Sequence, residues 1–305
     1  MKIGLIDVDG HNFPNLALMK ISAYHKAKGD SVEFVQFWGH YDRVYKSKVF
    51  TFTRDVEYSF FAPEIYSGGT GYNSDAVLPN EIEIMTPDYS LYPQYDYALG
   101  YLTRGCPRNC PFCIVGEKEG YKSVTVSSVD KIWKGQKEIK LLDPNLTASV
   151  DCMHLLRSLR KTNALIDFTQ GLDIRFLNNE MIELLKTMRI KRFHFAYDRL
   201  VDSKTIEQNL INFRDKTGYH KPSHNNVTVY VLVNYETSLA EDLYRLQFIR
   251  KLGFQPYVMI YNKHDLIKGK SIYFKLQRWV NNPPFFWKYS DFEAYLKAYQ
   301  LRRCV

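Results

Sequence analysis

The sequence has 305 residues, of which 45% are hydrophobic and 24% charged, a globular balance that excludes a disordered, collagen-like or coiled-coil chain. No apolar run approaches the roughly 18–20 residues of a membrane-spanning helix and the N-terminus lacks a signal-peptide pattern, so we expect a cytoplasmic protein with no membrane partner. Residues 1–100 carry 8 Lys+Arg against 13 Asp+Glu, whereas residues 101–305 carry 33 against 20, which indicates two units and favours an anionic partner for the basic one.

The first 90 residues predict a small α/β domain. Apolar runs and alternating patterns predict four strands and one helix. The strands are expected at 2–8, 31–37, 44–53 and 64–67, and the helix at 14–28. A strand, a helix and a strand within so few residues form a βαβ unit, which implies a parallel sheet. We therefore expect a doubly wound, Rossmann-like domain over residues 1–90. Its last residues overlap an extended, proline-containing linker over residues 79–93, which leads to the second unit.

The loop after the first predicted strand reads Asp9-Gly10-His11-Asn12-Phe13-Pro14. The dinucleotide fingerprint G-x-G-x-x-G is absent. The loop resembles the D-x-H-x-x-G motif of cobalamin-binding domains, which also follows a first strand. Pro14 stands where that motif has glycine, and the domain is short for enclosing a corrin ring. We therefore expect a degenerate domain that binds no cobalamin.

Three of the five cysteines fall within eight residues, after an apolar run that begins at Tyr97. Cys106, Cys110 and Cys113 are spaced C-x3-C-x2-C, whereas Cys152 and Cys304 stand apart and are not expected to be ligands. Pro111 argues against a helix here, and a loop can wrap three thiolates around one centre. In a cytosolic chain such a cluster indicates a metal site rather than disulfides.

Three kinds of metal site compete for this triplet. Structural zinc prefers four ligands, and no second C-x2-C pair follows. A ferredoxin-type cluster needs a fourth cysteine, which the run lacks. A [4Fe–4S] cluster held by three thiolates would leave one iron open to a substrate or cofactor, which is a catalytic feature.

The triplet, with Phe112 directly before its last cysteine, resembles the signature of the radical SAM superfamily. That resemblance implies a [4Fe–4S] cluster on Cys106, Cys110 and Cys113, with Phe112 beside the cofactor. It also implies reductive cleavage of S-adenosylmethionine (SAM) to a 5′-deoxyadenosyl radical that abstracts hydrogen from a substrate. An electron donor such as flavodoxin or ferredoxin, and a partial (β/α)6 barrel over residues 91–262, are implied as well.

The rest of the chain supplies the strands that a partial barrel needs. Six strands, including the one before the cysteines, recur at roughly 30-residue spacing. They are expected near residues 97, 138–143, 165–170, 192–197, 227–234 and 256–261. Active sites of such sheets lie at the carboxyl ends of the strands. Six polar residues at those ends are candidate SAM-binding residues, although Asp143 and Asn145 stand where the family often has G-G-E: Asp143, Asn145, Gln170, Asp173, Arg175 and Asn234.

Residues 263–305 form a basic, aromatic extension in which Ser290 and Glu293 predict a capping box for a terminal helix through Arg303. Basic clusters at residues 186–192 and 268–278, the second with aromatic neighbours, favour RNA or a nucleotide-like molecule as substrate. No catalytic side chain is predicted beyond the cofactor ligands. Two alternatives stay open: a non-catalytic iron–sulfur or zinc protein that binds nucleic acid, and a cobalamin-dependent radical SAM methyltransferase.

Overall fold

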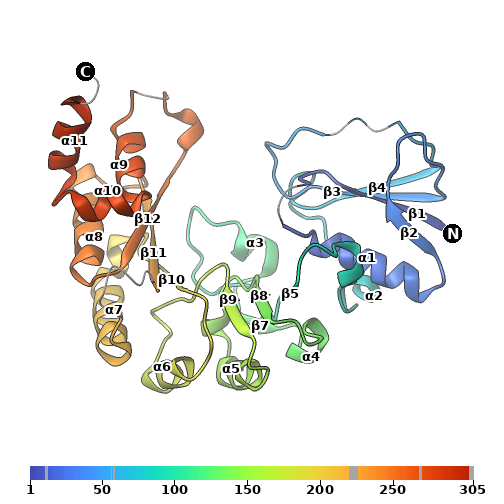
Figure 1. Ribbon diagram of the computed structural model, residues 1–305, viewed down its shortest axis with the longest axis horizontal. Helices are drawn as coiled ribbons and strands as arrows, with labels where there is room; N and C mark the ends of the chain where they lie inside the picture. The colour runs from blue at the N-terminus through green and yellow to red at the C-terminus, as the bar shows by residue number, and fades with distance from the viewer. Residues whose placement is uncertain (11–12, 56, 58, 220–225, 268–269, 302–305) are drawn as a thin grey trace. The chain divides into compact units, whose positions relative to one another are not determined.

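The computed structural model describes residues 1–10, 13–55, 57, 59–219, 226–267 and 270–301. The chain forms two compact units, Met1–Pro144 and Asn145–Val305, whose helices and strands are labelled in Figure 1. The finer domain boundaries expected near residues 90 and 262 stay predictions. None of the described helices is long and apolar enough to cross a membrane.

The first unit begins with a parallel sheet in the order β2-β1-β3-β4. Its strands are β1 (Lys2–Asp7), β2 (Ser31–Phe34), β3 (Arg43–Ser47) and β4 (Glu64–Gly68). Helix α1 (Leu16–Ala27) covers one face, where Leu18 and Ile21 join Ile3 and Leu5 in a buried cluster. Asn15 caps this helix by accepting a hydrogen bond from the backbone N–H of Leu18 at 3.2 Å.

The other face of this sheet is covered by extended chain instead of a helix. Between β2 and β3 the chain crosses the sheet, and Val35 and Tyr41 are buried there with Ile6 and Val44. Gly4 allows this close approach, because a Cβ at that position would lie 2.7 Å from Val35 Cγ2. The sheet is thus covered on both faces, as the doubly wound prediction requires.

The segment expected to be an extended linker contains two short helices, so that local prediction was wrong. They are α2 (Asn80–Glu83) and the 3-10 helix η1 (Tyr89–Leu91). Asp88 caps η1 through the Ser90 N–H at 3.0 Å and also accepts from the Ser22 hydroxyl of α1 at 2.6 Å. Tertiary contacts with α1 therefore order a segment whose prolines suggested an extended chain.

The remainder of the first unit carries the cysteines. Strand β5 (Tyr97–Gly100) pairs in parallel with β8 (Glu138–Leu141). Between them, β6 (Thr103–Arg104) and β7 (Val124–Thr125) form a short antiparallel pair, and α3 (Val115–Glu119) and α4 (Val129–Ile132) complete the segment. The β6–β7 pair encloses Cys106, Cys110 and Cys113, so the cysteine loop has an ordered base.

The second unit continues the alternation of strands and helices. Its strands are β9 (Leu165–Phe168), β10 (Phe193–Ala196), β11 (Val227–Val233) and β12 (Gln255–Ile260), and the last three pair in parallel. The intervening helices are η2 (Leu146–Ala148), α5 (Cys152–Lys161), α6 (Asn179–Lys186), η3 (Leu200–Asp202), α7 (Ser203–Thr217) and α8 (Leu239–Lys251). Together with β5 and β8, these are the six strands that the sequence predicts for a partial barrel.

The chain ends in helices packed on the edge of this sheet. They are η5 (Lys263–Asp265), α9 (Ile272–Val280), α10 (Pro283–Lys288) and α11 (Phe292–Leu301). Trp279 is fully buried among Phe286, Phe292 and Tyr295. Asp291, rather than the expected Ser290, caps α11 by accepting from the Ala294 N–H at 2.8 Å. Much of the aromatic content of the extension is therefore core, and Arg303 and Cys304 lie outside the described residues.

Candidate functional site

The cysteine loop is closed by its own backbone. Gly105 opens the loop at φ +85°, and a Cβ there would lie 2.2 Å from the carbonyl oxygen of Lys122. The backbone N–H of Cys106 donates to the carbonyl of Gly120 at 3.0 Å, and that of Cys113 to the carbonyl of Cys110 at 2.9 Å. The positive φ and the close backbone contact both require glycine at position 105.

Charged side chains brace the same loop. Arg104 donates to Glu119 at 3.0 Å and lies over the ring of Tyr101, with its guanidinium carbon 3.6 Å from the ring centroid. Glu83, at 3.5 Å from Arg104, also pairs with Lys20 at 2.7 Å, which connects the loop to α1. Burial lowers the pKa of Lys20, although its hydrogen bond to Glu83 acts to raise it. The ends of the cysteine loop are thus fixed independently of any metal.

The thiols themselves are accessible to different degrees. Cys106 and Cys110 are half-buried and Cys113 is exposed, whereas Cys152 is fully buried on α5, as expected of a core thiol. Within the part of the chain that the structure describes, no group of three or more His, Cys, Asp or Glu side chains is gathered closely enough to hold a metal ion. The loop provides the donor set of a three-thiolate iron–sulfur cluster, but the thiols have to converge to bind it.

Asp143 holds the backbone that leads to the cysteines. It lies at the end of β8 and is buried, and its carboxylate accepts from the backbone N–H of Leu102 at 3.1 Å and of Thr103 at 2.5 Å. The Thr103 hydroxyl also donates to it at 2.7 Å. Burial raises the pKa of Asp143 to about 6 although these hydrogen bonds oppose the shift. The described contacts of this carboxylate are therefore with the protein's own β5–β6 turn.

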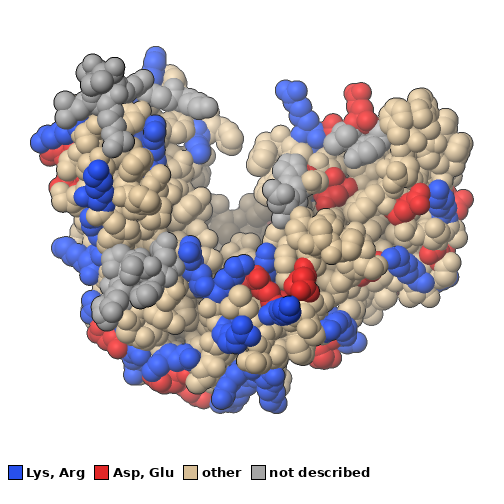
Figure 2. Space-filling model, in the orientation of Figure 1, with Lys and Arg blue, Asp and Glu red and all other residues tan. Residues whose placement is uncertain are grey.

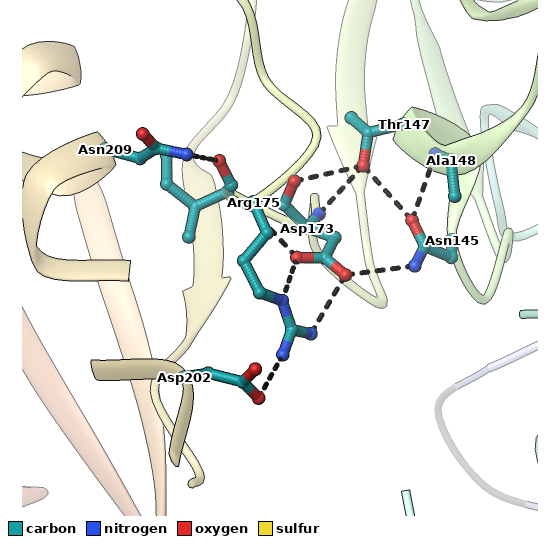
Figure 3. Close-up of polar contacts among 8 residues, drawn as sticks. Asn145, Thr147, Ala148, Asp173, Arg175, Asp202 and Asn209 are labelled. Carbon is teal, nitrogen blue, oxygen red and sulfur yellow. Dashed lines mark hydrogen bonds and ion pairs between the residues drawn. The ribbon is translucent and has the colours of Figure 1, made fainter. Parts of the chain in front are cut away.

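In the second unit, three of the predicted polar residues meet in one hydrogen-bonded network (Figure 3). The Asn145 amide donates to Asp173 at 3.1 Å, and Arg175 donates to both oxygens of Asp173 at 2.7 and 2.9 Å. Thr147 links the loops, since its hydroxyl lies 3.1 Å from Asn145 Oδ1 and accepts from the Asp173 N–H at 3.0 Å. The loops after β8 and β9 are thereby held together.

The same network reaches the loop after β10. Arg175 Nη1 donates to Asp202 at 2.8 Å, so two carboxylates hold this guanidinium. Asn209 of α7 donates to the carbonyl of Ile174 at 3.0 Å (Figure 3). Thr147, Asp202 and Asn209 were not predicted. Their position at or near strand ends could have pointed to a binding site. Polar residues are common in loops, however, so this position alone does not distinguish them.

The other predicted cofactor residues lie elsewhere. Gln170 is exposed after β9, and Phe112 is half-buried within the cysteine loop. Asn234 lies at the end of β11 with φ +63°, and its N–H donates to Asp242 at 3.2 Å. Their roles toward SAM stay predictions.

A buried ion pair fixes the ends of β10 and β11. Asp242 and Arg245 of α8 are fully buried and hydrogen-bonded to each other. Arg245 also donates to the carbonyls of Tyr197 and Asp198 at 2.7 Å and of Leu232 at 2.9 Å. Burial raises the pKa of Asp198, which accepts from the Leu232 N–H at 2.8 Å. Arg245 therefore positions two strand ends through their backbone carbonyls.

A second candidate ligand site lies in the N-terminal sheet. The chain passes from β1 to β2 on one side and returns to β3 on the other, so the strand order reverses between β1 and β3. Ligands of open α/β sheets bind at this switch point, beyond the carboxyl ends of the strands. Asp9 joins the two loops there, accepting from the Val49 N–H at 2.5 Å and the Thr53 hydroxyl at 2.7 Å.

This edge presents exposed aromatic rings. Phe50 and Phe52 follow β3, are 50% and 72% exposed, and stack with ring centroids 5.2 Å apart. Lys118 of α3, the helix that follows the cysteine loop, donates to the hydroxyl of Thr70 in the loop after β4. The carboxyl edge of the N-terminal sheet therefore adjoins the helix that follows the cysteine loop. His11 of the cobalamin-like motif lies outside the described residues.

Similarity between this chain and known proteins is found among solved structures, and not among protein families or curated proteins. No protein-family model matches the chain, and no curated protein matches it. Among solved structures, the chain is similar to a radical S-adenosylmethionine methyltransferase, TsrM, from Kitasatospora setae, solved with cobalamin and a [4Fe–4S] cluster bound. The TM-score is 0.62 at 9% sequence identity, over 85% of this chain and 74% of that one. The chain therefore shares the fold of that methyltransferase over most of its length.

The similarity confirms the α/β architecture that the cysteine signature implied. A match over 85% of the chain cannot be confined to residues 91–305, so the similarity extends into the N-terminal α/β region.

Proposed function

We propose that this protein is a radical SAM enzyme that holds a [4Fe–4S] cluster through Cys106, Cys110 and Cys113. The observation that carries the proposal is the cysteine triplet on a closed loop directly after β5, the first of the six barrel strands, in a chain with this fold. With three thiolates as ligands, such a cluster would supply the electron that cleaves bound SAM reductively.

The protein's own contribution is to bind and orient SAM. The cofactor offers a cationic amino group, a carboxylate and ribose hydroxyls, which need acceptors and donors held in fixed positions. Asn145, Asp173 and Arg175 provide both, and Asp173 fixes the guanidinium of Arg175 by a bidentate contact. We assign the SAM-binding role to this network, while Asp143 keeps the cysteine loop in place.

Methyl transfer with cobalamin as a second cofactor is the second candidate function. The shared fold with TsrM and the loops of the β1–β3 switch point favour it. The exposed rings of Phe50 and Phe52 suit a large ligand with an apolar face, and the contact between Lys118 and Thr70 brings that edge to the cysteine loop. Pro14, in place of the motif glycine, is the feature that argues against it.

Anaerobic reconstitution with iron and sulfide tests the main proposal. We expect about four irons and four sulfides per chain, and slow release of 5′-deoxyadenosine from SAM after reduction. Alanine at Cys106, Cys110 or Cys113 should remove both signals, whereas Cys152→Ala should keep them. A protein that holds only zinc and takes up no sulfide would contradict the proposal and favour the non-catalytic alternative.

The same preparation separates the two candidate functions. Methylcobalamin that co-elutes with the protein in gel filtration, together with S-adenosylhomocysteine among the products, would support methyl transfer. Free elution of cobalamin, with 5′-deoxyadenosine as the product, would leave a radical SAM enzyme without cobalamin.

A further inference from the structure

Among the described residues, helices α7 and α8 pack on one of the two faces of the sheet β10-β11-β12. Phe193 and Phe195 pack on Phe213 of α7, so the alternate residues of β10 point away from α7. Strand register places His194 opposite Thr228, and Tyr230 opposite Tyr257. These four residues define what we call the open face. In Figure 1, α7 and α8 lie together on one side of these strands.

The open face carries a row of aromatic rings. The ring of Tyr230 lies 5.6 Å from that of His194 on one side and 5.6 Å from that of Tyr257 on the other. Tyr257 is 43% exposed, and its neighbour Met259 is exposed as well. His194 and Tyr230 are half-buried and Tyr257 is exposed, so the row runs from the interior of the sheet to solvent. Aromatic side chains of a strand normally lie in the core, and a row that reaches solvent favours contact with a ligand.

Polar groups surround the rings. Burial lowers the pKa of His194. Asp167 belongs to β9, and Arg192 directly precedes Phe193, the first residue of β10. Lys191 pairs with Asp167 at 3.4 Å. Thr228 is 5% exposed, and among the described residues its hydroxyl has no hydrogen-bond partner. A buried hydroxyl without a partner is costly unless a ligand satisfies it.

We propose that the open face binds unpaired bases of a single-stranded RNA substrate. Ring faces stack on bases, the cations Lys191 and Arg192 match phosphates, and Asp167 and Thr228 can hydrogen-bond base edges. The combination of rings with cations at one end favours RNA over an apolar peptide. This inference rests on the proposed radical SAM function, of which it names the substrate class.

Figure 2 shows where the charged side chains lie on one side of the molecule. On the side of the molecule that it presents, Lys and Arg lie over α5 and α6 with Asp and Glu among them. Mixed charge of this kind is ordinary for exposed helices. The rings and their polar neighbours, and not the overall charge, therefore distinguish the open face from the rest of the surface.

Fluorescence anisotropy of a short labelled single-stranded RNA with the full-length protein tests the inference. Tyr257→Ala should weaken binding about 10-fold, since it removes one stacking surface. Tyr257→Phe should bind like the original protein and controls for folding. Tyr244→Ala is the matched control, because Tyr244 is 52% exposed on α8, on the helix-covered side, and its loss should leave RNA affinity unchanged.

Salt dependence provides the second measurement. Arg192→Gln should reduce the slope of log K against log salt by about 0.7, the value of one phosphate contact on a single strand. Arg157→Gln, which removes an exposed cation on α5, should leave the slope unchanged. Equal effects of Tyr257→Ala and Tyr244→Ala, or no RNA binding at low salt, would overturn the inference. A peptide that binds with the Tyr257 dependence expected of RNA would also overturn it.

The two proposals fail separately. RNA binding is measured without SAM and without reduction, so it does not depend on cluster chemistry. If the unaltered protein binds RNA but does not cleave SAM, only the radical SAM proposal is refuted. SAM cleavage without RNA binding would refute only the role of the open face.

Discussion

The cysteine loop of the first unit and the Asn145–Asp173–Arg175 network of the second unit differ in how their functional groups are organised. The network is assembled by hydrogen bonds among its own side chains and needs no ligand to hold its shape. The loop has a fixed base, but its three thiols are not gathered into a metal site among the described residues. Three thiolates are drawn together by the metal that they bind, so metal binding stabilises that arrangement. Buried charged groups need their hydrogen-bond partners even without a ligand, so the network is formed in advance.

Gly105→Ala should break the loop without touching a cysteine. The added Cβ would lie 2.2 Å from the backbone oxygen of Lys122, so the loop has to open at its base. We expect loss of most of the iron and sulfide that reconstitution otherwise delivers, measured by metal and sulfide analysis.

Gly120→Ala is the matched control for that variant. Gly120 also has a positive φ, +97°, but nothing lies within 4 Å of its Cβ position. Only backbone strain of about 1–3 kcal/mol should result, because side-chain-bearing residues rarely adopt φ +97° with ψ 163°, and cluster content should be retained. Equal cluster loss in both variants would show that backbone strain, and not the close contact of Gly105 with Lys122, determines whether the loop holds a cluster.

Arg175→Gln should damage the network while the loop stays intact. Asp173 would lose its bidentate partner and Asp202 its cation, so the residues proposed to orient SAM would move. We expect the KM for SAM in the cleavage assay to rise about 10-fold, equivalent to about 1.4 kcal/mol, with cluster content unchanged.

Arg157→Gln is the control, because Arg157 forms an exposed pair with Glu180 on which little stability depends. A loss of cluster in Arg175→Gln would mean that the two sites are not independent. An unchanged KM would remove the network from SAM binding.

Asp143 gives the smallest expected effect, a change in pH dependence. Burial raises its pKa to about 6 in the folded protein, above the ordinary value of 3.8, so the folded state binds the proton more tightly than the unfolded state. Stability from this group is therefore greatest at low pH, falls as pH rises from about 4 to about 6, and is constant above that range. Asp143→Asn should flatten this decline in urea-unfolding midpoints.

Asp143→Ala distinguishes titration from hydrogen bonding. It leaves the N–H groups of Leu102 and Thr103 without their acceptor, so stability should fall at every pH. If the asparagine variant keeps the decline between pH 4 and 6, another group is responsible for it.

The sequence predicted these two regions through different signals. The spacing of Cys106, Cys110 and Cys113 is local, so it was readable without knowledge of the fold. The grouping of Asn145, Asp173 and Arg175 followed from placing polar residues at the ends of parallel strands. Thr147 and Asp202 were missed because nothing in their local sequence distinguishes them from other polar loop residues.

Elements stabilised by tertiary contacts were the hardest to predict. The β6–β7 pair has two residues per strand, too few to show a period. Helix α2 lies in a proline-containing segment and is held to α1 by Lys20 and Glu83. On the other face of the N-terminal sheet, the strand expected at 31–37 ends at Phe34, and the chain around Val35 and Tyr41 crosses the sheet instead.

The outer edge of β12 has a consequence for the protein's behaviour at high concentration. The Asn281 side chain, just after α9, accepts from the backbone N–H of Val258 at 2.7 Å and donates to its carbonyl at 3.0 Å, as a neighbouring strand would. Gln277 donates to the same carbonyl at 3.0 Å. With this stretch of backbone already paired, a strand from a second molecule finds no template there, and aggregation through sheet extension is blocked at Val258.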